Sequence, residues 1–331
     1  MNVLSLFDGM SCTQIALERA GIHVTNYFAS ELDKNAIKIT MKNYPATIQL
    51  GDVTKIDYHK LPKIDLLVGG SPCQGFSFAG KQLNFNDPRS RLFFNFFTAM
   101  MQVKPTYFLL ENVRMKKEYQ DVISQWLGVE PIMIDSNLVS AQNRKRFYWT
   151  NIPGVGQPMD RHIMLKDIIQ YDVTEPNSEA WHRYFERRKD KMQFKSYIGV
   201  MNDLDKSLTC VARQGTNSWS GNIFQLTQMR SEEGRRIRRE ARLQTGKDFS
   251  PRKYQELVPR TDGKANTLTT DLTEQSIVGP RYRFLTCIEA ERLQTVPDNY
   301  TEGVSTSARY KMLGNGFTVE VIAWILAHLP A

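Results

Sequence analysis

Cysteine is scarce in this chain of 331 residues, and long apolar runs are missing. The cysteines form no Cys-x-x-Cys pair and have no histidine at metal-ligand spacing; they are Cys12, Cys73, Cys210 and Cys287. This pattern disfavours both a zinc site and a disulfide framework. No stretch approaches the roughly 20 apolar residues of a membrane span, and the first residues contain no basic segment followed by a long apolar run. We therefore expect a cytoplasmic protein in reducing surroundings, with neither a metal nor a membrane as partner.

The chain also has no excess of acidic residues, because 43 Lys and Arg stand against 35 Asp and Glu, a formal net charge of +8. Positive charge suits a polyanionic partner without requiring one. The basic residues concentrate in segments 181–195 and 229–260. Runs of mixed sign are often solvated helix faces, so these segments fit either a solvated surface or phosphate contact.

Short apolar runs alternate with amphipathic segments as far as about residue 154. Strands are predicted at 3–7, 23–30 and 64–70, a third short strand is expected to end near 51–53, and residues 107–113 are a strand with its loop. Helices are predicted at 13–20, 34–44 and 91–102, and closing strands within 131–139 and 146–151. Such alternation is typical of an α/β fold with a doubly wound, mostly parallel sheet.

The alternation stops after this region and amphipathic helix returns near the end of the chain. Polar, Arg-rich sequence fills the interval. We expect one α/β domain made of residues 1–155 and 282–331, interrupted by a smaller domain at 156–281.

The stretch "LLVGGSPCQGFSFAG" (66–80) holds the first candidate site residue. An apolar strand runs into two glycines, and Cys73 follows Pro72 directly. Because Pro72 restricts the backbone on both sides, Cys73 is expected on a constrained loop at a strand's carboxyl end, where open α/β sheets place their chemistry. A lone cysteine is more often a small buried side chain, so this prediction depends on the neighbouring loops.

Three other loops are predicted at the same edge of the sheet. "FDGMSC" (7–12) is a glycine-containing turn before a helix, which suits a nucleotide-like ligand. Glu31 follows the second strand, where an acid accepts hydrogen bonds from ribose hydroxyls. Asp52 and Glu111 follow the third and fifth strands. An acid at one strand end is more often a helix cap, but together these residues indicate a dinucleotide-like or adenosyl cofactor site beside Cys73.

With these residues in place, the chain resembles the DNA (cytosine-5)-methyltransferases. The family's ordered blocks are present as "FDGMS", Glu31, "GDV", "GGSPCQGFS", "ENV", "QNRKRFY" (142–148), "RFLTCIEAERLQTVP" (283–297) and "LGNGF" (313–317). Departures in the first and last blocks resemble bacterial and phage enzymes and eukaryotic de novo methyltransferases. The resemblance implies a Rossmann-like fold that uses S-adenosylmethionine, with residues 156–281 as a target-recognition domain.

The resemblance also implies a covalent mechanism on cytosine. The Cys73 thiolate would add to carbon 6, which turns carbon 5 into a nucleophile able to accept the methyl group of S-adenosylmethionine. Glu111 would supply a proton or hydrogen bond at ring nitrogen 3. Arg146 would hold the cytosine carbonyl oxygen, and Arg144 would help to fix the loop and the substrate backbone.

The resemblance assigns eight residues to the cofactor site: Phe7, Asp52 and Val53 at the adenine or its surroundings, Asp8 and Gly9 at the amino acid part, Glu31 at the ribose, and Asn315 and Phe317 closing the pocket.

Cytosine inside double-stranded DNA is inaccessible, so the resemblance implies that the base is flipped out. The substrate contacts it suggests are Ser77 at the target phosphate, Gln82 in the gap left by the base, Gln142, and the pair Thr267 and Leu268 at the flipped nucleotide. The expected partners are duplex DNA, bound by a monomer, and a matching restriction endonuclease. The expected source is bacterial or phage.

Three alternatives stay open. A tRNA cytosine-5 methyltransferase uses the same blocks, although the large insertion favours duplex DNA. A catalytically inactive DNA-binding relative would typically lack the nucleophile or the cofactor residues, and here Cys73, Glu111, Glu31 and Asp52 are present. A nucleotide-dependent oxidoreductase using NAD would leave the Pro-Cys and Gln-Asn-Arg-Lys-Arg loops unexplained.

Overall fold

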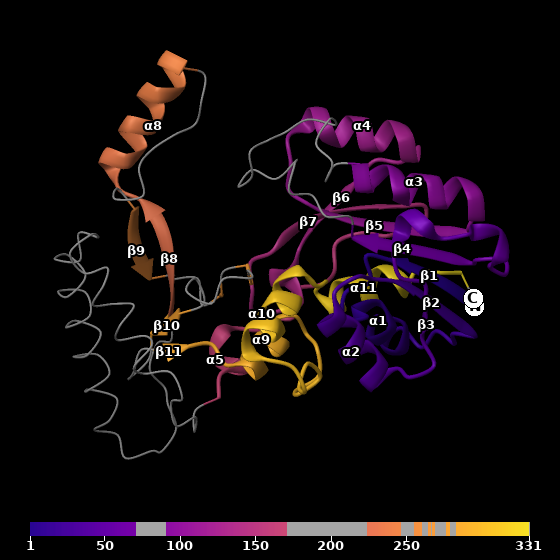
Figure 1. Cartoon of the computed structure of the whole chain (residues 1–331). Coiled ribbons are helices and arrows are strands. Elements are labelled where there is room, and N and C mark those ends of the chain that lie inside the picture. The colour runs from indigo at the N-terminus through magenta and orange to yellow at the C-terminus, as the bar shows by residue number, and fades with distance from the viewer. Residues whose placement is uncertain are drawn as a thin grey trace.

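A computed structural model describes most of the large domain and parts of the insertion (Figure 1). The described residues are 1–70, 91–170, 224–245, 255–259, 264–265, 267–268, 276–278 and 283–330. Cys73, Ser77 and Gln82 lie outside them, so their predicted roles stay predictions.

A seven-stranded sheet forms the centre of the large domain, in the order β3-β2-β1-β4-β5-β7-β6. Its strands are β1 (Asn2–Leu6), β2 (Asn26–Ser30), β3 (Ile48–Gln49), β4 (Leu66–Gly70), β5 (Tyr107–Val113), β6 (Ile132–Asp135) and β7 (Lys145–Thr150). The first five strands run parallel, and β7 is antiparallel to both of its neighbours. The structure thus confirms the mostly parallel sheet.

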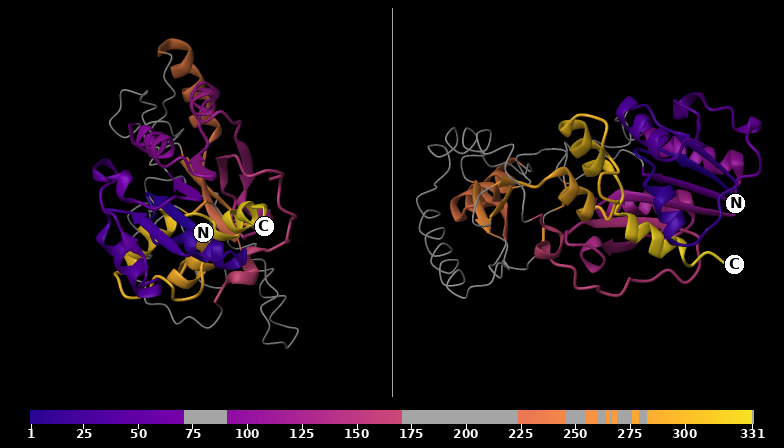
Figure 2. Two further views of the ribbon diagram at one scale, coloured as in Figure 1. Left: turned by 90° about the vertical axis from the view of Figure 1, so that its right-hand side faces the viewer. Right: turned by 90° about the horizontal axis from the view of Figure 1, so that it is seen from below.

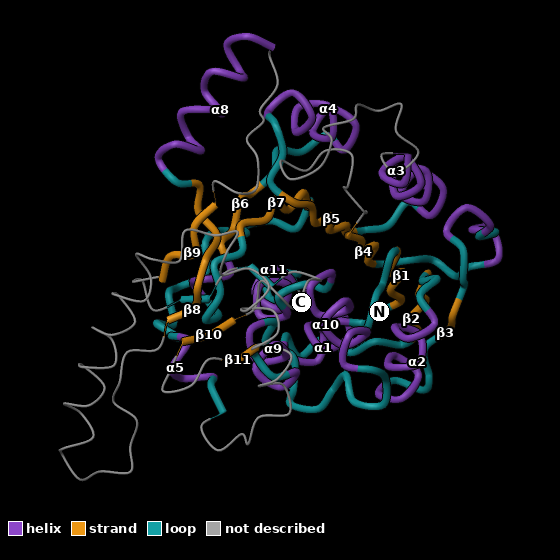
Figure 3. Tube along the Cα trace, turned by 60° about the vertical axis from the view of Figure 1, so that its left-hand side comes forward, coloured by secondary structure: helices purple, strands orange, loops and turns teal. Residues whose placement is uncertain are grey.

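Helices cover both faces of this sheet, which explains why its central strands are almost continuously apolar. In Figure 3, α3 and α4 lie on one side of the strands and α1, α2, α9, α10 and α11 on the other. The helices are α1 (Cys12–Arg19), α2 (Lys34–Asn43), α3 (Arg91–Val103), α4 (Lys117–Leu127), α9 (Cys287–Leu293), α10 (Thr306–Asn315) and α11 (Val319–Leu326). Each side has its own apolar core.

Two details differ from the sequence-based predictions. The third strand, expected to end near 51–53, ends earlier: β3 stops at Gln49, and a short 3-10 turn occupies Val53–Lys55. Gly51 has a φ of +72° and the Asp52 side chain caps the turn, so the backbone leaves the sheet there. Helix α4 was not predicted, although Tyr119, Ile123 and Trp126 follow a helical spacing.

A second sheet of four strands, in the order β11-β10-β8-β9, lies within and at the end of the predicted insertion. Its strands are β8 (Phe224–Arg230), β9 (Gln255–Pro259), β10 (Ser276–Val278) and β11 (Arg283–Phe284), and α8 (Glu232–Thr245) follows β8. Figure 2 shows both termini on the large domain, at the end away from this sheet.

The two ends of the predicted insertion pack on the large domain. Helix α5 (Leu165–Ile168) shares an apolar core with α9, and the Gln170 amide donates to Glu289. At the other end, Ala265 pairs with Gln142 in a parallel bridge. Both contacts lie inside the predicted bounds of 156 and 281, whereas β10 and β11 still belong to the second sheet, so the predicted domain bounds stay a prediction.

In the part of the chain that the structure describes, no helix is long and apolar enough to cross a membrane. The same residues contain no group of three or more His, Cys, Asp or Glu side chains that could hold a metal ion.

Candidate active site

The predicted site loops meet where the strand order of the large sheet reverses. Strand β1 pairs with β2 on one side and with β4 on the other. Loops that leave neighbouring strands in opposite directions open a crevice at such a point, which is where doubly wound sheets bind ligands. The loop after β1 and the end of β4 therefore lie at the same crevice.

The loop after β1 has an unusual backbone. Phe7, Gly9 and Ser11 have φ values of 57°, 61° and 60°, which place them in the left-handed region. At Gly9 an added Cβ would meet no atom within 4 Å, so this side of the loop faces open space. The Phe7 side chain packs against the core between the sheet and α3. This conformation turns the chain sharply from β1 into α1.

The Asp8 carboxylate holds this loop from the inside. It is buried, accepts a hydrogen bond from Tyr27 at 2.6 Å and another from the Ser11 hydroxyl. Burial raises the pKa of Asp8 from 3.8 to about 6, although the hydrogen bonds from Ser11 and Tyr27 oppose this shift. Asp8 is thus directed into the protein, and only its neighbour Gly9 faces the open side.

Glu31, at the end of β2, lies directly beside Gly9. Its Oε2 accepts a hydrogen bond from the Gly9 amide at 2.8 Å. Its Oε1 accepts from the amides of Leu32 and Asp33 at 2.7 and 2.8 Å. A carboxylate offers about four acceptor positions, so three backbone donors fix Glu31 and leave one position for a ligand hydroxyl.

Asp52 follows β3 and caps the short turn that begins at Val53. Its Oδ1 accepts from the amide and hydroxyl of Thr54 at 2.9 and 2.8 Å. These hydrogen bonds hold the pKa of Asp52 below its usual value of 3.8. Val53 is buried in the core under this edge, whereas Oδ2 of Asp52 lies 3.8 Å from Lys55 at the surface.

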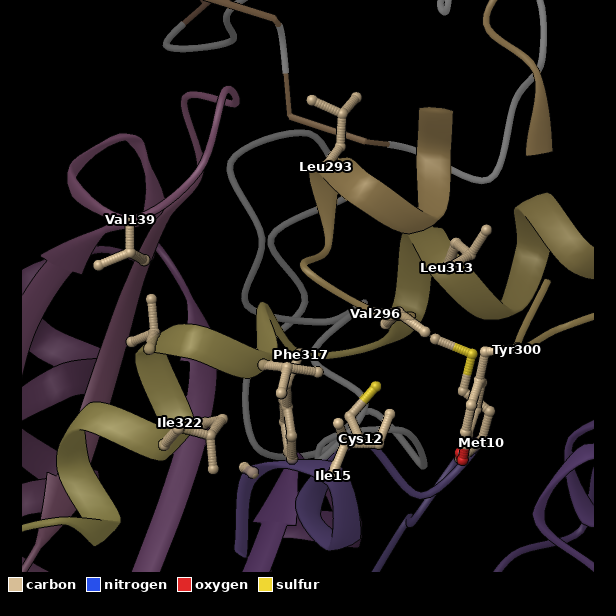
Figure 4. Close-up of a cluster of buried hydrophobic side chains, with 14 of the residues drawn as sticks. Met10, Cys12, Ile15, Val139, Leu293, Val296, Tyr300, Leu313, Phe317 and Ile322 are labelled. Atoms are coloured by element: carbon tan, nitrogen blue, oxygen red, sulfur yellow. The ribbon is translucent and has the colours of Figure 1, made fainter. Parts of the chain in front are cut away.

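The end of β4 meets β5 and the chain that follows α10. Gly70 pairs with Glu111 in the parallel register. A Cβ added at Gly70 would lie 2.7 Å from the Phe317 ring and 3.5 Å from Glu111 Oε2, so only glycine allows this approach. Figure 4 shows the Phe317 side chain beside Cys12 and Ile15 of α1. Cys73 is three residues beyond Gly70 in the sequence.

Glu111 forms an ion pair with Arg146, with 3.0 Å between Oε1 and Nε. Glu111 lies opposite Tyr148 on the antiparallel strand β7, and Arg146 is two residues before Tyr148 on the same strand. Residues two apart on a strand share a face, so the long Arg146 side chain reaches Glu111 diagonally. Both side chains are mostly buried, at 11% and 13% exposure. Two predicted catalytic residues are therefore in contact.

Arg144 points the other way, into the protein. Its guanidinium donates to the carbonyl oxygens of Leu268, Gly314 and Gly316 at 2.9 to 3.3 Å. Burial lowers the pKa of Arg144 to about 9, which still leaves it charged at neutral pH. Arg144 thus holds the backbone on both sides of Asn315, the exposed last residue of α10.

Gln142 is fully buried and joins two distant segments. Its side-chain amide donates to the Leu293 carbonyl and to Gln294 Oε1, and its Oε1 accepts from the Leu268 amide at 3.1 Å. Gln294 in turn donates to the Leu313 carbonyl at 2.6 Å and accepts from Thr318 at 2.9 Å. Any effect of Gln142 on a substrate would therefore be transmitted through the segments it joins.

The predicted pair Thr267 and Leu268 lies against this network. The Thr267 hydroxyl donates to the Asn143 carbonyl, and Leu268 is buried in the core that contains α9. The ammonium of Lys264 is buried among three backbone carbonyl oxygens, those of Asn137, Ser140 and Ile163.

Sequence reasoning did not single out Tyr27, Ser11 or Gln294. Tyr27 lies in a strand that was predicted correctly, but nothing local indicates that its hydroxyl reaches Asp8. Gln294 stands within one of the quoted blocks, and that block was the only available signal for it.

Comparison with known proteins identifies the family. The family model described as C-5 cytosine-specific DNA methylase matches residues 1–330. The chain belongs to the C-5 cytosine-specific DNA methylase family. It is 30% identical over 336 residues to the type II methyltransferase M1.ScrFI of Lactococcus lactis subsp. cremoris, a match that covers 97% of this chain and 75% of that protein.

Other family relatives match over shorter segments. The orphan methyltransferase M.Rho11sI of Bacillus phage rho11s is 37% identical over 161 residues, 45% of this chain and 32% of that protein. The orphan methyltransferase M.SPRI of Bacillus phage SPR is 34% identical over 189 residues, 51% of this chain and 42% of that protein. The matches to these two phage relatives thus span less than half of their length.

Two solved structures share the fold across almost the whole chain. The Entamoeba histolytica methyltransferase EhMeth superposes with a TM-score of 0.64 at 16% identity, covering 99% of this chain and 97% of that one. The S. pombe Dnmt2 methyltransferase gives a TM-score of 0.57 at 18% identity, covering 99% and 97%. At this identity they support the Rossmann-like methyltransferase fold and nothing finer.

Proposed function

We propose that this protein transfers a methyl group from S-adenosylmethionine to carbon 5 of a cytosine in duplex DNA. The observation that carries the proposal is the contact between Glu111 and Arg146 next to Gly70, at the crevice of the sheet. A carboxyl group and a guanidinium side by side match the ring nitrogen and carbonyl oxygen of cytosine. Membership of the family supports the same chemistry.

Cys73 would provide the nucleophile. Its thiolate forms a bond to carbon 6, and the electron pair of the 5,6 double bond moves toward carbon 5 while ring nitrogen 3 takes a proton or hydrogen bond from Glu111. Arg146 holds the carbonyl oxygen, where negative charge increases. After methylation, loss of the carbon 5 proton expels the thiolate and restores the double bond.

The loops after β1, β2 and β3 fit the cofactor. When bound, S-adenosylmethionine supplies an electrophilic methyl group. Gly9 borders open space, and Glu31 keeps an acceptor position for a ribose hydroxyl. Asp52 Oδ2, which is paired with Lys55 only at 3.8 Å, would accept from an amino group. Phe317, packed on Gly70, would close the site toward the nucleophile loop, with Asn315 and Phe7 at its border. Asp8 would act by holding the loop.

The test is methyl transfer from tritiated S-adenosylmethionine to mixed-sequence duplex DNA and, separately, to total tRNA. Tritium is expected in DNA, and bisulfite sequencing of the product should then show the modified cytosines and their sequence context. Tritium in tRNA alone would establish the rival assignment, and tritium in neither would support an inactive relative.

The matched variants are Cys73→Ser and Cys12→Ser. Cys73→Ser should abolish turnover while DNA binding persists. Cys12 is buried in the core, and burial raises its pKa to about 12, so Cys12→Ser should retain methyl transfer if the protein folds. A Cys73→Ser protein with full activity would refute the covalent mechanism.

A further inference from the structure

Helix α8 stands apart from the candidate active site. It follows β8 and begins at Ser231, whose hydroxyl accepts from the Gly234 amide at 3.1 Å. In Figures 1 and 3 it extends beyond the ends of β8 and β9 and covers neither face of the seven-stranded sheet. No role in catalysis or cofactor binding accounts for it.

One side of α8 is apolar and small. Gly234, Ile237 and Ala241 recur at helical spacing, and all three are buried or half-buried. This side is the less exposed one, and most of the exposed residues on the rest of the helix are charged, with Leu243 and Gln244 as exceptions.

Four arginines share one of the remaining sides. Arg235, Arg238, Arg239 and Arg242 occupy positions i, i+3, i+4 and i+7, which fall on a single helix face. We call these four residues the arginine stripe. Of the acidic residues of α8, only Glu232 borders the stripe, in the first turn, where a carboxylate favours the helix dipole.

The fifth arginine of the helix lies elsewhere and is paired. Arg236 contacts Glu233 at 2.7 Å and Glu240 at 2.8 Å, so its charge is balanced within the helix. Arg235 and Arg239 are exposed, and neither forms an ion pair with any residue that the structure describes. Within the stripe, Arg235 and Arg239 are therefore the arginines whose charge is exposed and not balanced by another described residue, while Arg238 is half-buried.

We propose that the arginine stripe binds the phosphate backbone of duplex DNA outside the recognised bases. The stripe extends about 10 Å along the helix axis, and duplex DNA carries about one charge per 1.7 Å, so several phosphates lie within its reach. Arginine binds phosphate through paired N–H groups and stays charged at all relevant pH values. The contact is independent of sequence and adds affinity to base reading elsewhere in the insertion. This inference rests on the proposed function and adds a second protein surface that contacts DNA.

The test measures binding of a fluorescent mixed-sequence DNA duplex by anisotropy at increasing KCl. Each phosphate neutralised contributes about 0.9 to the slope of log affinity against log salt. Arg235→Gln combined with Arg239→Gln should therefore reduce the slope by about 1.8 and weaken binding at low salt. The KM for DNA should rise, and kcat at saturating DNA should stay at the wild-type value.

Two single variants distinguish the effect of an arginine's position on the helix from the effect of net charge. Arg239→Gln and Arg236→Gln remove the same charge from the same helix, but only the first lies on the stripe. Arg239→Gln should reduce the slope by about 0.9, Arg236→Gln should leave it unchanged, and Arg239→Lys should restore it. Circular dichroism checks that all variants keep the helix.

An unchanged slope in the double variant would overturn the proposal. So would equal losses in Arg239→Gln and Arg236→Gln, which would mean that net charge alone acts. A loss confined to a tRNA probe would assign the stripe to RNA instead. Failure of the proposed function is a separate result, because it appears as a lack of methyl transfer to DNA by the wild-type protein, whatever the slopes are.

Discussion

The polar groups beneath the candidate site and those of α8 are arranged in opposite ways. Beneath the site, Gln142, Arg144 and Gln294 are buried and use their donors on backbone carbonyls and on one another. On α8, Arg235 and Arg239 are exposed on one helix face. Buried polar groups are costly unless satisfied, whereas exposed arginines remain available to a partner. The first arrangement holds the protein's own segments together, and the second suits an external ligand.

The pair of Glu111 and Arg146 is neither completely buried nor exposed. Its disruption should have the largest effect on activity. Glu111→Gln keeps the shape but removes the proton donor, so the single-turnover rate of DNA methylation should fall about a thousandfold, within the usual range for general acid–base groups. DNA binding should persist. Glu118→Gln, in the exposed first turn of α4, is the control and should retain wild-type activity. A rate within threefold of wild type for Glu111→Gln would exclude Glu111 from the reaction.

Gln294→Leu tests the buried arrangement. It removes the donor to Leu313 and the acceptor for Gln142 and Thr318, so the free energy of unfolding should drop by about 3 kcal/mol or more. Urea denaturation measures this change. Gln157→Leu removes a single hydrogen bond at an exposed site and should cost less than about 1 kcal/mol. Equal losses of unfolding free energy in the two variants would mean that the buried network stabilises the protein no more than a single exposed hydrogen bond does.

The buried Asp8 carboxyl should make the free energy of unfolding depend on pH. Its pKa is 3.8 when unperturbed and about 6 in the folded protein, so between these values the folded state binds more protons than the unfolded state. Stability from this group is present below pH 3.8 and is lost as pH rises through 6, by about 3 kcal/mol in total.

The measurement is the free energy of unfolding of wild type minus that of Asp8→Asn, from pH 4 to 7. This difference should fall with rising pH. Asp57→Asn is the control: an ion pair with Lys60 lowers the pKa of Asp57, so the corresponding difference should rise with pH across the acid range. A flat curve for Asp8→Asn would contradict the role of burial.

The smallest effect is expected on α8. Arg236→Gln breaks two exposed ion pairs, with Glu233 and Glu240, and should change the free energy of unfolding by less than about 1 kcal/mol. Thermal unfolding followed by circular dichroism measures this change. A larger loss would show that the ion pairs of this helix contribute to stability on the same scale as the buried hydrogen bonds.

The sequence predicted well those features that depend on neighbours in the chain. Apolar runs located β1, β2, β4 and β5 within a few residues, and the end of β2 located Glu31. Glu111 was expected after the fifth strand, but it lies within β5, opposite Gly70. Asp52 was expected at the same edge of the sheet as Glu31, and it lies after β3, where its side chain caps the short turn that begins at Val53.

Long-range contacts were beyond such reasoning. By resemblance, Gln142 was expected at the substrate, and Arg144 was expected to fix the loop and the substrate backbone. The structure buries both side chains against backbone carbonyls more than a hundred residues away in the chain. Local patterns do not specify which distant backbone group a side chain will reach. The contact of Tyr27 with Asp8 escaped prediction for the same reason.

The contacts where the insertion leaves and rejoins the large domain determine which residues can be exchanged as one unit. Gln170 is tied to Glu289 at the exit, and Ala265 is paired with the segment before Arg144 at the return. Both contacts are made with the large domain, so the insertion is attached to it at two places. Because β10 (Ser276–Val278) pairs with β8, the second sheet takes strands from both sides of the Ala265 contact. An exchange of the insertion for that of a relative therefore has to include β10 and β11, and the new segment has to reproduce the contact of Ala265 with Gln142.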